Sequence, residues 1–581
     1  MLKTLLGEVK EYWKATILSP VFMILEVIVE TVIPLLMASL VNNGIEVEGG
    51  NLPHIYKIGI IMVVVAVIGL FAGVLGGKYA ALASAGFAKN LRKAMFHNIQ
   101  TFSFSNIDKY STAGLVTRLT TDVTNLQMAY MMTIRMAIRA LFSMVFAMGG
   151  AFFLNAKVAS IYLIAVILLA LVVSVIMSHA AKFFHQVFQK YDDLNASVQE
   201  NVSGIRVVKA YVREEYEINR FEKAALNIYN MFVRAEKNII VNMPIMMLTV
   251  YTCILAISWV GAHYIVAGDM ETGDLMALLT YCMNILMSLM MLSMVFVMIS
   301  MSSASGERIA EVIKESSELT NPENPVMTVE NGSIRFDHVN FKYKKDANDN
   351  VLKDINLDIR AGETIGIIGG TGSAKTSLVS LISRLYDVTD GAVLVGGHDV
   401  REYDMTVLRN QVSVVLQKNT LFSGTIYDNL RWGDPDATDE ECRRACRLAC
   451  ADEFIDKMPD GYNTHIEQGG ANVSGGQKQR LCIARALLKK PKVLILDDST
   501  SAVDTATDAK IRKAFAEEIP DTTKLIIAQR ISSVQQADRI IVMHEGEISA
   551  VGNHEELLKS SQIYREVYES QMKAGGDFDQ Q

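Results

Sequence analysis

Long apolar stretches fill the first half of the chain, and short apolar runs fill the second half. Each stretch in the first half is long enough for the roughly 20 helical residues that cross about 30 Å of hydrocarbon. From Ile334 the pattern changes to short β-rich runs separated by turns and helical segments, such as ETIGIIG, KVLILDD and KLIIAQ. We expect a polytopic α-helical membrane domain followed by an α/β domain. The predicted spans lie near residues 15–42, 55–83, 128–154, 157–181, 239–267 and 275–301.

Composition and charge support this division. Hydrophobic residues make up 50% of the 581 residues and charged residues only 20%, which is apolar for a water-soluble enzyme. Residues 1–310 hold 23 Lys+Arg and 20 Asp+Glu, whereas residues 311–581 hold 32 and 43, so the net charges are +3 and −11. The predicted domains are a membrane domain at 1–310, a linker at 311–326, an α/β domain at 327–573 and a polar tail at 574–581.

The six cysteines are too few to form a disulfide framework in so long a chain, and a reducing compartment suits the second half. Cys442, Cys446 and Cys450 recur every four residues, so a helix would place the three thiols on one stripe. Metal binding is disfavoured, because no His or fourth thiol lies nearby and zinc takes four ligands.

Lys and Arg gather in the loops after the second and fourth spans and are nearly absent from the other loops. Cytoplasmic loops carry this excess, so we expect a multi-pass protein of the cell (inner) membrane with both termini in the cytoplasm. The arrangement of six spans per chain, a short N-terminus and no targeting presequence favours a bacterial inner membrane.

Two pairs of charged residues interrupt the predicted spans. Glu26 and Glu30 are four residues apart in the first span, and Arg135 and Arg139 are four apart in the third, at similar depth. We predict that the pairs meet across the helices, either as a structural ion pair or as a gate on a translocation path. The sixth span is rich in Met, which indicates ordinary packing or a surface that accepts varied apolar guests.

A glycine-rich loop lies between a predicted strand and a helical segment in the second half. This order is typical of a phosphate-binding loop, in which backbone N–H groups and a helix N-terminus cradle phosphates. Lys375 would meet the β and γ oxygens, and Thr376 would hold Mg²⁺. Ala374 replaces the usual glycine, and we expect altered rather than lost affinity if its φ is negative. The loop residues are Gly369, Gly370, Thr371, Gly372, Ser373, Ala374, Lys375, Thr376 and Ser377.

A buried strand further on ends in two carboxylates, Asp497 and Asp498. Downstream of a phosphate loop, Asp497 is placed to approach Mg²⁺, and Asp498 to face the attacking water. Ser501-Ala-Val-Asp504 follows directly and strengthens this interpretation.

Between these motifs, Asn472-Val precedes Ser474, Gly475, Gly476 and Gln477, and here the sequence resembles the ATP-binding cassette (ABC) superfamily. Nearly the whole chain is similar to an exporter half-transporter of that family. The resemblance implies that Tyr343 stacks on adenine, that Gln417 senses Mg²⁺ and the membrane domain, and that ATP and Mg²⁺ are the cofactors. It also implies that the loops after the second and fourth spans carry coupling helices that rest on the cassettes.

Two positions depart from the family's pattern. The family has a Glu after the Mg²⁺-binding Asp and a His after the next strand, where this chain has Asp498 and Gln529. Asp is one methylene shorter than Glu, and a misplacement of about 1 Å can cost about 100-fold in rate. In the family each ATP lies between the phosphate loop of one chain and the signature motif of the other. The resemblance therefore implies a heterodimer in which this chain keeps a slow site and lends an intact signature to a partner that has Glu and His.

The function that we expect is ATP-driven export of amphipathic or hydrophobic molecules, with multidrug efflux favoured over lipid or peptide transport. An ATP-gated channel or regulatory subunit is the alternative from another class. Expected partners are the second half-transporter, membrane lipid and a small amphipathic substrate, and not nucleic acid.

Overall fold

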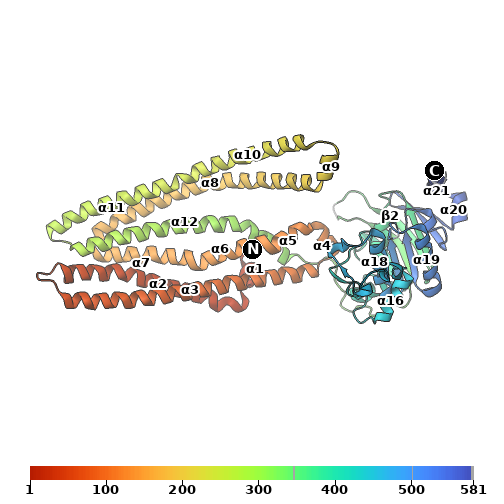
Figure 1. Cartoon of the computed structure of the whole chain (residues 1–581), viewed down its shortest axis with the longest axis horizontal. Helices are drawn as coiled ribbons and strands as arrows, with labels where there is room; N and C mark the ends of the chain where they lie inside the picture. Colours follow the sequence, from red (N-terminus) through yellow and green to blue (C-terminus); the bar gives the residue numbers. More distant parts are fainter. Residues whose placement is uncertain (345–346, 500, 577–581) are drawn as a thin grey trace. The chain divides into compact units, whose positions relative to one another are not determined.

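The computed structural model describes the backbone of residues 1–344, 347–499 and 501–576, and it divides the chain into two units (Figure 1). The helical unit comprises residues 1–101 and 111–315. The α/β unit comprises residues 102–110 and everything from Ser316 onward. Residues 577–581 of the predicted polar tail lie outside the described residues. Residues 102–110 therefore fold with the α/β unit although they lie between two helices of the other unit.

Among its described residues, the helical unit contains six segments long and apolar enough to cross a membrane, which confirms the predicted spans. These segments are Lys10–Ile45, Leu52–Gln100, Thr112–Leu154, Ala156–Ile176, Met243–Ala267 and Thr272–Lys314. The α-helices of the unit are α1 (Leu2–Gly7), α2 (Trp13–Leu40), α3 (Leu52–Gln100), α5 (Thr112–Thr117), α6 (Val123–Met132), α7 (Ile138–Leu154), α8 (Ala156–Ser203), α9 (Ile205–Ala210), α10 (Glu214–Ile240), α11 (Asn242–Ala267) and α12 (Thr272–Lys314).

Several of these helices are far longer than a membrane requires. α3 has 49 residues and α8 has 48, so each is roughly 70 Å long at 1.5 Å per residue. The short α9 joins the far ends of α8 and α10, which pack side by side (Figure 1). The third span is not one regular helix, because the π-helical turns η3 (Arg118–Asp122) and η4 (Thr133–Ala137) separate α5, α6 and α7. Such turns often mark functional positions in helices.

The predicted contact between the charged pairs of the first and third spans is confirmed for one of the two arginines. Arg139 Nη2 lies 3.1 Å from Glu30 Oε2 and 3.8 Å from Glu26 Oε1, so α7 and α2 are joined by an ion pair. Arg135, in η4, instead faces the backbone of α3, where a Cβ added at Gly77 would lie 3.5 Å from Arg135 Nη2. No ion pair of Arg135 with either glutamate is found among the described residues.

Among its described residues, the α/β unit contains two larger sheets and one small two-stranded antiparallel sheet, which pairs β7 with β8. The four-stranded antiparallel sheet has the order β2-β1-β4-β5, and the six-stranded sheet has the order β12-β11-β3-β10-β9-β6 with only β12 antiparallel. The strands are β1 (Ile334–Phe341), β2 (Leu352–Ile359), β3 (Thr364–Gly369), β4 (Asp390–Val395), β5 (His398–Asp399), β6 (Val412–Val415), β7 (Gly424–Thr425), β8 (His465–Ile466), β9 (Val493–Asp497), β10 (Thr523–Ile527), β11 (Arg539–His544) and β12 (Glu547–Gly552).

Two hydrophobic cores stabilise this unit. One lies between the two larger sheets and includes Phe336, Ile367 and Ile495 together with Leu378 of α13. The other is built largely by the helices that follow β6. The helices of the unit are α4 (Phe104–Lys109), α13 (Lys375–Ile382), α14 (Met405–Gln411), α15 (Ile426–Leu430), α16 (Asp439–Leu448), α17 (Asp452–Ile455), α18 (Gly475–Leu488), α19 (Thr505–Glu518), α20 (His554–Ser560) and α21 (Gln562–Gly576).

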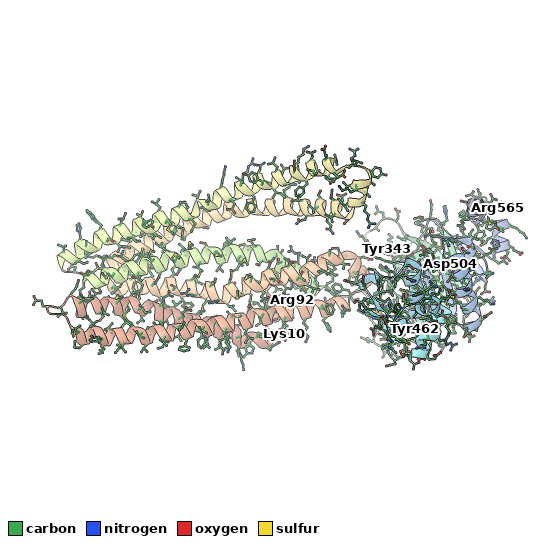
Figure 2. The ribbon with its side chains drawn as sticks, in the orientation of Figure 1. Lys10, Arg92, Tyr343, Tyr462, Asp504 and Arg565 are labelled. Carbon is green, nitrogen blue, oxygen red and sulfur yellow. The ribbon has the colours of Figure 1, made fainter. Side chains whose placement is uncertain are left out.

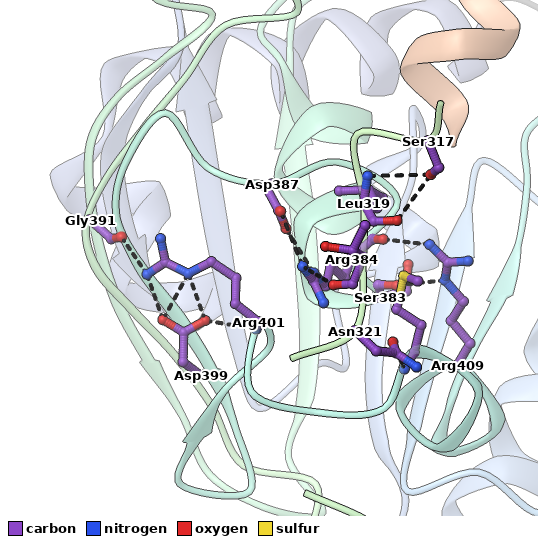
Figure 3. Close-up of polar contacts among 12 residues, drawn as sticks. Ser317, Leu319, Asn321, Ser383, Arg384, Asp387, Gly391, Asp399, Arg401 and Arg409 are labelled. Atoms are coloured by element: carbon purple, nitrogen blue, oxygen red, sulfur yellow. Dashed lines mark hydrogen bonds and ion pairs between the residues drawn. The ribbon is translucent and has the colours of Figure 1, made fainter. Parts of the chain in front are cut away.

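The residues after α13 hold the start of the linker (Figure 3). Arg384 is buried, donates from Nη2 to the carbonyl oxygen of Thr320 at 3.2 Å, and forms an ion pair with Asp387. Arg409 donates in turn to the carbonyl oxygen of Arg384 at 2.7 Å. Asn106 of α4 donates to the carbonyl oxygen of Ser316 at 3.1 Å. Arg384 therefore binds the backbone of the linker, and Asn106 binds α4 to the same linker.

The ion pair between Arg139 and the glutamates of α2 yields a first prediction. Arg139→Glu should lower the thermal stability of the full chain in lipid, because three carboxylates would then lie together within apolar surroundings. Adding Glu30→Arg should restore most of the loss. A double variant no more stable than Arg139→Glu alone, measured by thermal unfolding in nanodiscs, would contradict the pairing.

Candidate nucleotide-binding site

The order of the parallel strands brings three loops to one edge of the six-stranded sheet. β10 lies between β3 and β9, with Ile527 paired to Ile367 on one side and to Asp497 on the other. The loop from Gly370 follows β3, Asp498 follows β9 and Gln529 follows β10. Ligands of open α/β sheets bind beyond the carboxyl ends of the strands. Here a cavity of about 540 Å³ lies at that edge and is lined by Gly369–Ser377, Gln417, Asp497, Asp498 and Gln529, with Val351, Ile527 and Val567.

The loop after β3 wraps around its own lysine. Lys375 Nζ donates to the carbonyl oxygens of Gly369 and Gly370, both at 2.8 Å. Burial lowers the pKa of Lys375, an effect that Asp497 and Asp498 oppose. A Cβ at Gly369 would meet the carbonyl oxygen of Met543 at 2.4 Å, so β11 leaves room only for glycine there. Gly370 and Gly372 have open space where a Cβ would be, which suits the close approach of phosphate oxygens to the backbone.

Ala374 does not have the negative φ on which our expectation for this position depended. Its φ is +69° and its ψ is 23°, in the left-handed region that favours glycine. Ala374 precedes α13 directly, and a side chain in this conformation costs about 1–2 kcal/mol. Ala374 adopts this conformation because the turn from β3 into α13 requires a positive φ at this position, whichever residue occupies it. Ala374 therefore keeps the loop geometry at an energetic cost.

Thr376 and Asp497 form an oxygen-rich corner of the cavity. Thr376 Oγ1 donates to Asp497 Oδ2 at 2.9 Å. Burial raises the pKa of the Asp497 carboxyl, and the negative charge of Asp498 adds to the effect, while the Thr376 hydrogen bond opposes it. A hydroxyl next to a buried carboxylate is the donor set that a hard divalent cation prefers, and a cation would lower the raised pKa. The pair therefore fits Mg²⁺.

Asp498 and Gln529 bond to each other directly. Gln529 Nε2 donates to Asp498 Oδ2 at 2.7 Å. Burial raises the pKa of Asp498, while hydrogen bonds from Gln529 and Gln417 oppose that shift. Asp498 itself has a φ of +48°. The carboxylate next to the phosphate loop is thus held between two side-chain amides.

Tyr343 and Asp504 lie outside the lining of this cavity. Tyr343, which Figure 2 labels, is 45% exposed. It packs edge-on against Phe341 and Tyr386, and its hydroxyl lies 2.8 Å from Ser377 Oγ. Its ring is therefore available beside the start of α13. Asp504 caps α19 by accepting from the Thr507 N–H at 2.9 Å, and this bond lowers the pKa of Asp504.

The signature segment begins α18. Ser474 is the N-cap, with its hydroxyl accepting from the Gln477 N–H and its own N–H donating to Gln477 Oε1. Ser474 and Gly475 are exposed, and a Cβ at Gly476 would lie 2.7 Å from the carbonyl oxygen of Ala502. None of these residues lines the described part of the phosphate-loop cavity. The N-terminus of α18 is exposed, so its N–H groups can bind a phosphate that lies outside this cavity.

Two residues near the site, Gln479 and Tyr386, were not predicted from the sequence. Gln479 of α18 is buried, accepts from the Ala502 N–H at 3.0 Å and donates toward the backbone carbonyl of Asp498, so it ties the signature helix to the carboxylate loop. Tyr386 donates to Asp108 of α4 at 2.6 Å and packs on Phe104. Gln479 stands five residues after Ser474, and this close spacing could have drawn attention to it.

Cys442, Cys446 and Cys450 are buried in the core around α16. Burial raises the pKa of each of these thiols, as expected for cysteines that pack as apolar side chains. Among the described residues no group of three or more His, Cys, Asp or Glu side chains could hold a metal ion.

Comparison with known proteins agrees with this fold and site. Residues 16–306 match the ABC transporter transmembrane region, and residues 352–501 match the ABC transporter family model for the ATPase domain. An uncharacterized ABC transporter ATP-binding protein of Bacillus subtilis, YfiB, is 36% identical over 96% of both chains. An ATP-dependent lipid A-core flippase of Desulfotalea psychrophila is 33% identical over 83% of this chain and 84% of its own length.

A solved structure of a bacterial Atm1-family ABC exporter with ATP bound has the same fold. Its TM-score is 0.82 at 23% identity, and the match covers 96% of this chain and 98% of that one. The chain therefore belongs to the ABC transporter family. It is a half-transporter with the exporter fold, in which a six-span membrane region precedes one ATPase domain that couples ATP hydrolysis to transport. Half-transporters of this kind act as dimers.

The left-handed conformation of Ala374 yields a second prediction. Ala374→Gly should raise the stability of the nucleotide-free protein by about 1 kcal/mol, because glycine adopts this conformation without the Cβ penalty. Ala509→Gly is a matched control, since Ala509 is exposed in the interior of α19 and its replacement should cost about 1 kcal/mol. If the midpoint temperature of unfolding fell equally in both variants, the left-handed conformation assigned to Ala374 would be wrong.

The bond between Tyr386 and Asp108 yields a third prediction. Tyr386→Phe keeps the ring against Phe104 but removes a hydrogen bond to a carboxylate, which contributes about 1.5–3 kcal/mol. Molecules transported per ATP hydrolysed should fall several-fold, while ATP affinity stays the same. Both rates are measured in the same proteoliposomes. Asp108→Asn retains an acceptor and should be milder than Asp108→Ala, and equal losses of transport and hydrolysis in Tyr386→Phe would contradict a coupling role.

Proposed function

We propose that this chain is the slow-site subunit of a heterodimeric exporter that moves amphipathic or hydrophobic molecules, of the multidrug type, out of the cytoplasm or the inner leaflet. The observation that carries the proposal is the bond between Gln529 and Asp498. These residues occupy the two positions where the sequence pattern of the family has a His and a Glu. Each replacement weakens the same step, the activation of water beside the γ-phosphate.

The chemistry of the pair explains why hydrolysis should be slow. The Asp498 carboxylate is one methylene shorter than Glu, and its Oδ2 accepts a hydrogen bond from the Gln529 amide, so this oxygen already has a partner other than water. An amide supplies a hydrogen bond but does not exchange a proton as an imidazole does. By contrast Lys375, Thr376 and Asp497 retain the groups that bind ATP. We therefore expect ATP to bind here and to be retained.

Mg²⁺, when bound at Thr376 and Asp497, would neutralise charge on the phosphates. The ammonium of Lys375 would exchange its contacts with the Gly369 and Gly370 carbonyls for phosphate oxygens, and Gln417 would lie next to both the cation and Asp498. Tyr343 would present its exposed ring to adenine. These groups bind and orient the nucleotide, and only the group that activates water is impaired.

The Ser474–Gln477 segment, which is exposed at Ser474 and Gly475, supports the proposal that this chain completes the site of a partner. Its capping box holds the first turn of α18 open toward solvent, and the segment does not line this chain's own cavity within the described residues. A phosphate loop of a second chain would meet it in a head-to-tail dimer. If that chain carries Glu and His, the dimer has one slow site and one fast site, and α9 of this chain would reach the cassette of the partner.

Orientation and cargo follow from the helical unit. The excess of Lys and Arg in the loops after the second and fourth spans supports a cytoplasmic location for both termini. Met276, Met283, Met287 and Met294 of α12 are exposed, and flexible thioethers suit varied apolar guests. The lipid A-core flippase relative favours lipid as the second candidate cargo. Peptide transport and an ATP-gated channel rank below both, and uphill flux into vesicles distinguishes a pump from a channel.

The division of labour yields a fourth prediction. In the purified heterodimer, changing the catalytic Glu of the partner to Gln should nearly abolish ATP hydrolysis, whereas Asp498→Asn should lower it only a few-fold, because the slow site contributes little to turnover. Lys375→Ala should slow or uncouple the cycle. Equal and complete loss from Asp498→Asn and from the partner change, or brisk coupled transport by this chain alone, would contradict the proposal.

A further inference from the structure

The last described helix, α21, runs along the loop that carries Gln529. Gln571 of α21 makes two hydrogen bonds to that loop, donating from Nε2 to the Gln529 carbonyl oxygen at 2.7 Å and accepting from the Ile531 N–H at 2.9 Å. The two bonds hold the backbone on both sides of Arg530. One side chain therefore fixes the segment from which the Gln529 side chain projects.

The same face of α21 reaches the cavity. Val567 stands one turn before Gln571 and is among the residues that line the phosphate-loop cavity. Tyr564, one turn earlier, is completely buried, and its hydroxyl lies 2.7 Å from His554 Nδ1. Arg565 donates to the carbonyl oxygens of Leu558 and Lys559. α21 is thus anchored to α20 at its start and presents Val567 and Gln571 to the site.

A chain of hydrogen bonds connects this helix to the carboxylate beside the phosphates. Gln571 holds the Gln529 backbone, and the Gln529 side chain donates to Asp498 Oδ2. Gln529 is otherwise an exposed side chain at the end of a strand, with several rotamers open to it. Fixing its backbone limits the directions in which its amide can point and keeps the amide on Asp498.

We propose that Gln571 is a positioning residue for the γ-phosphate end of the site, acting through the backbone of Gln529. This inference rests on the proposed place of Gln529 beside the γ-phosphate. According to this inference, α21 contributes to the difference in affinity between a nucleoside triphosphate and a diphosphate. In the proposed site the adenine and the α and β phosphates would be bound by Tyr343 and the loop after β3, and among the described residues the hydrogen bonds of the Gln571 side chain go instead to Gln529 and Ile531.

The experiment measures binding of AMP-PNP and of ADP, each with Mg²⁺, to the purified full chain in detergent or nanodiscs. Gln571→Ala should weaken AMP-PNP about 3- to 10-fold, the effect of losing one or two hydrogen bonds, and change ADP by less than about twofold. Gln571→Glu should behave similarly, because a carboxylate still accepts from the Ile531 N–H but has no proton to donate to the Gln529 carbonyl. Gln562→Ala is the matched control, since Gln562 lies on the same helix and its side-chain amide donates to its exposed neighbour Glu566 at 2.8 Å.

The decisive comparison repeats Gln571→Ala in a Gln529→Ala background. A residue that acts through the Gln529 side chain should then have no further effect on the ratio of the two affinities. Equal weakening of AMP-PNP and ADP, or the same fall in both backgrounds, would show a merely structural helix contact and overturn the inference. If Gln529→Ala alone left the ratio unchanged, the proposed place of Gln529 would be wrong and the role of Gln571 with it. If Gln529→Ala changed the ratio and Gln571→Ala did not, only the inference would fail.

Discussion

β10 forms parallel ladders with β3 on one side and β9 on the other, and the positions of the site residues depend on this pairing. Because parallel strands end at the same edge, the phosphate loop, Asp498 and Gln529 converge although they lie up to 160 residues apart. The right-handed connections that parallel strands require place α13 against the sheet. One hydrogen-bonding arrangement thereby builds the cavity, orients Lys375 at its floor and brings the Gln529 amide onto the Asp498 carboxylate.

The phosphate-binding loop also lies close in sequence to the residues that bind the linker and α4. α13 begins at Lys375, and within a few residues of its end Arg384 holds the linker and Tyr386 holds Asp108 of α4. The helix that begins at the phosphate loop is therefore followed directly by the two residues that bind the linker and α4, the segments through which the chain connects this unit to the helical unit. On the opposite side, Gln479 ties α18 to the backbone after Asp498.

Much of this organisation could be predicted from the sequence. The six spans, the α/β domain and the order of the phosphate loop and the paired carboxylates follow from hydrophobic period and motif spacing, which are local properties of the chain. The signature was identified by its resemblance to the ABC family. The contact of Arg139 with Glu30 was predicted from depth alone, because unpaired charges in hydrocarbon are costly. The prediction failed to separate Arg135 from Arg139, since η4 changes the helical phase between them.

The sequence by itself determined which groups are present: the Lys375, Thr376 and Asp497 side chains, the Ser474–Gln477 segment, and Asp498 and Gln529 at the two positions where the family's pattern has Glu and His. Only the tertiary structure decided how those groups are used. It placed Ala374 in a left-handed turn, closed the Asp498–Gln529 bond, and brought Gln571 to a loop forty residues away. The physical reason is that motif identity is local, whereas the direction of a backbone or an amide is set by strands and helices distant in the chain that pack against it.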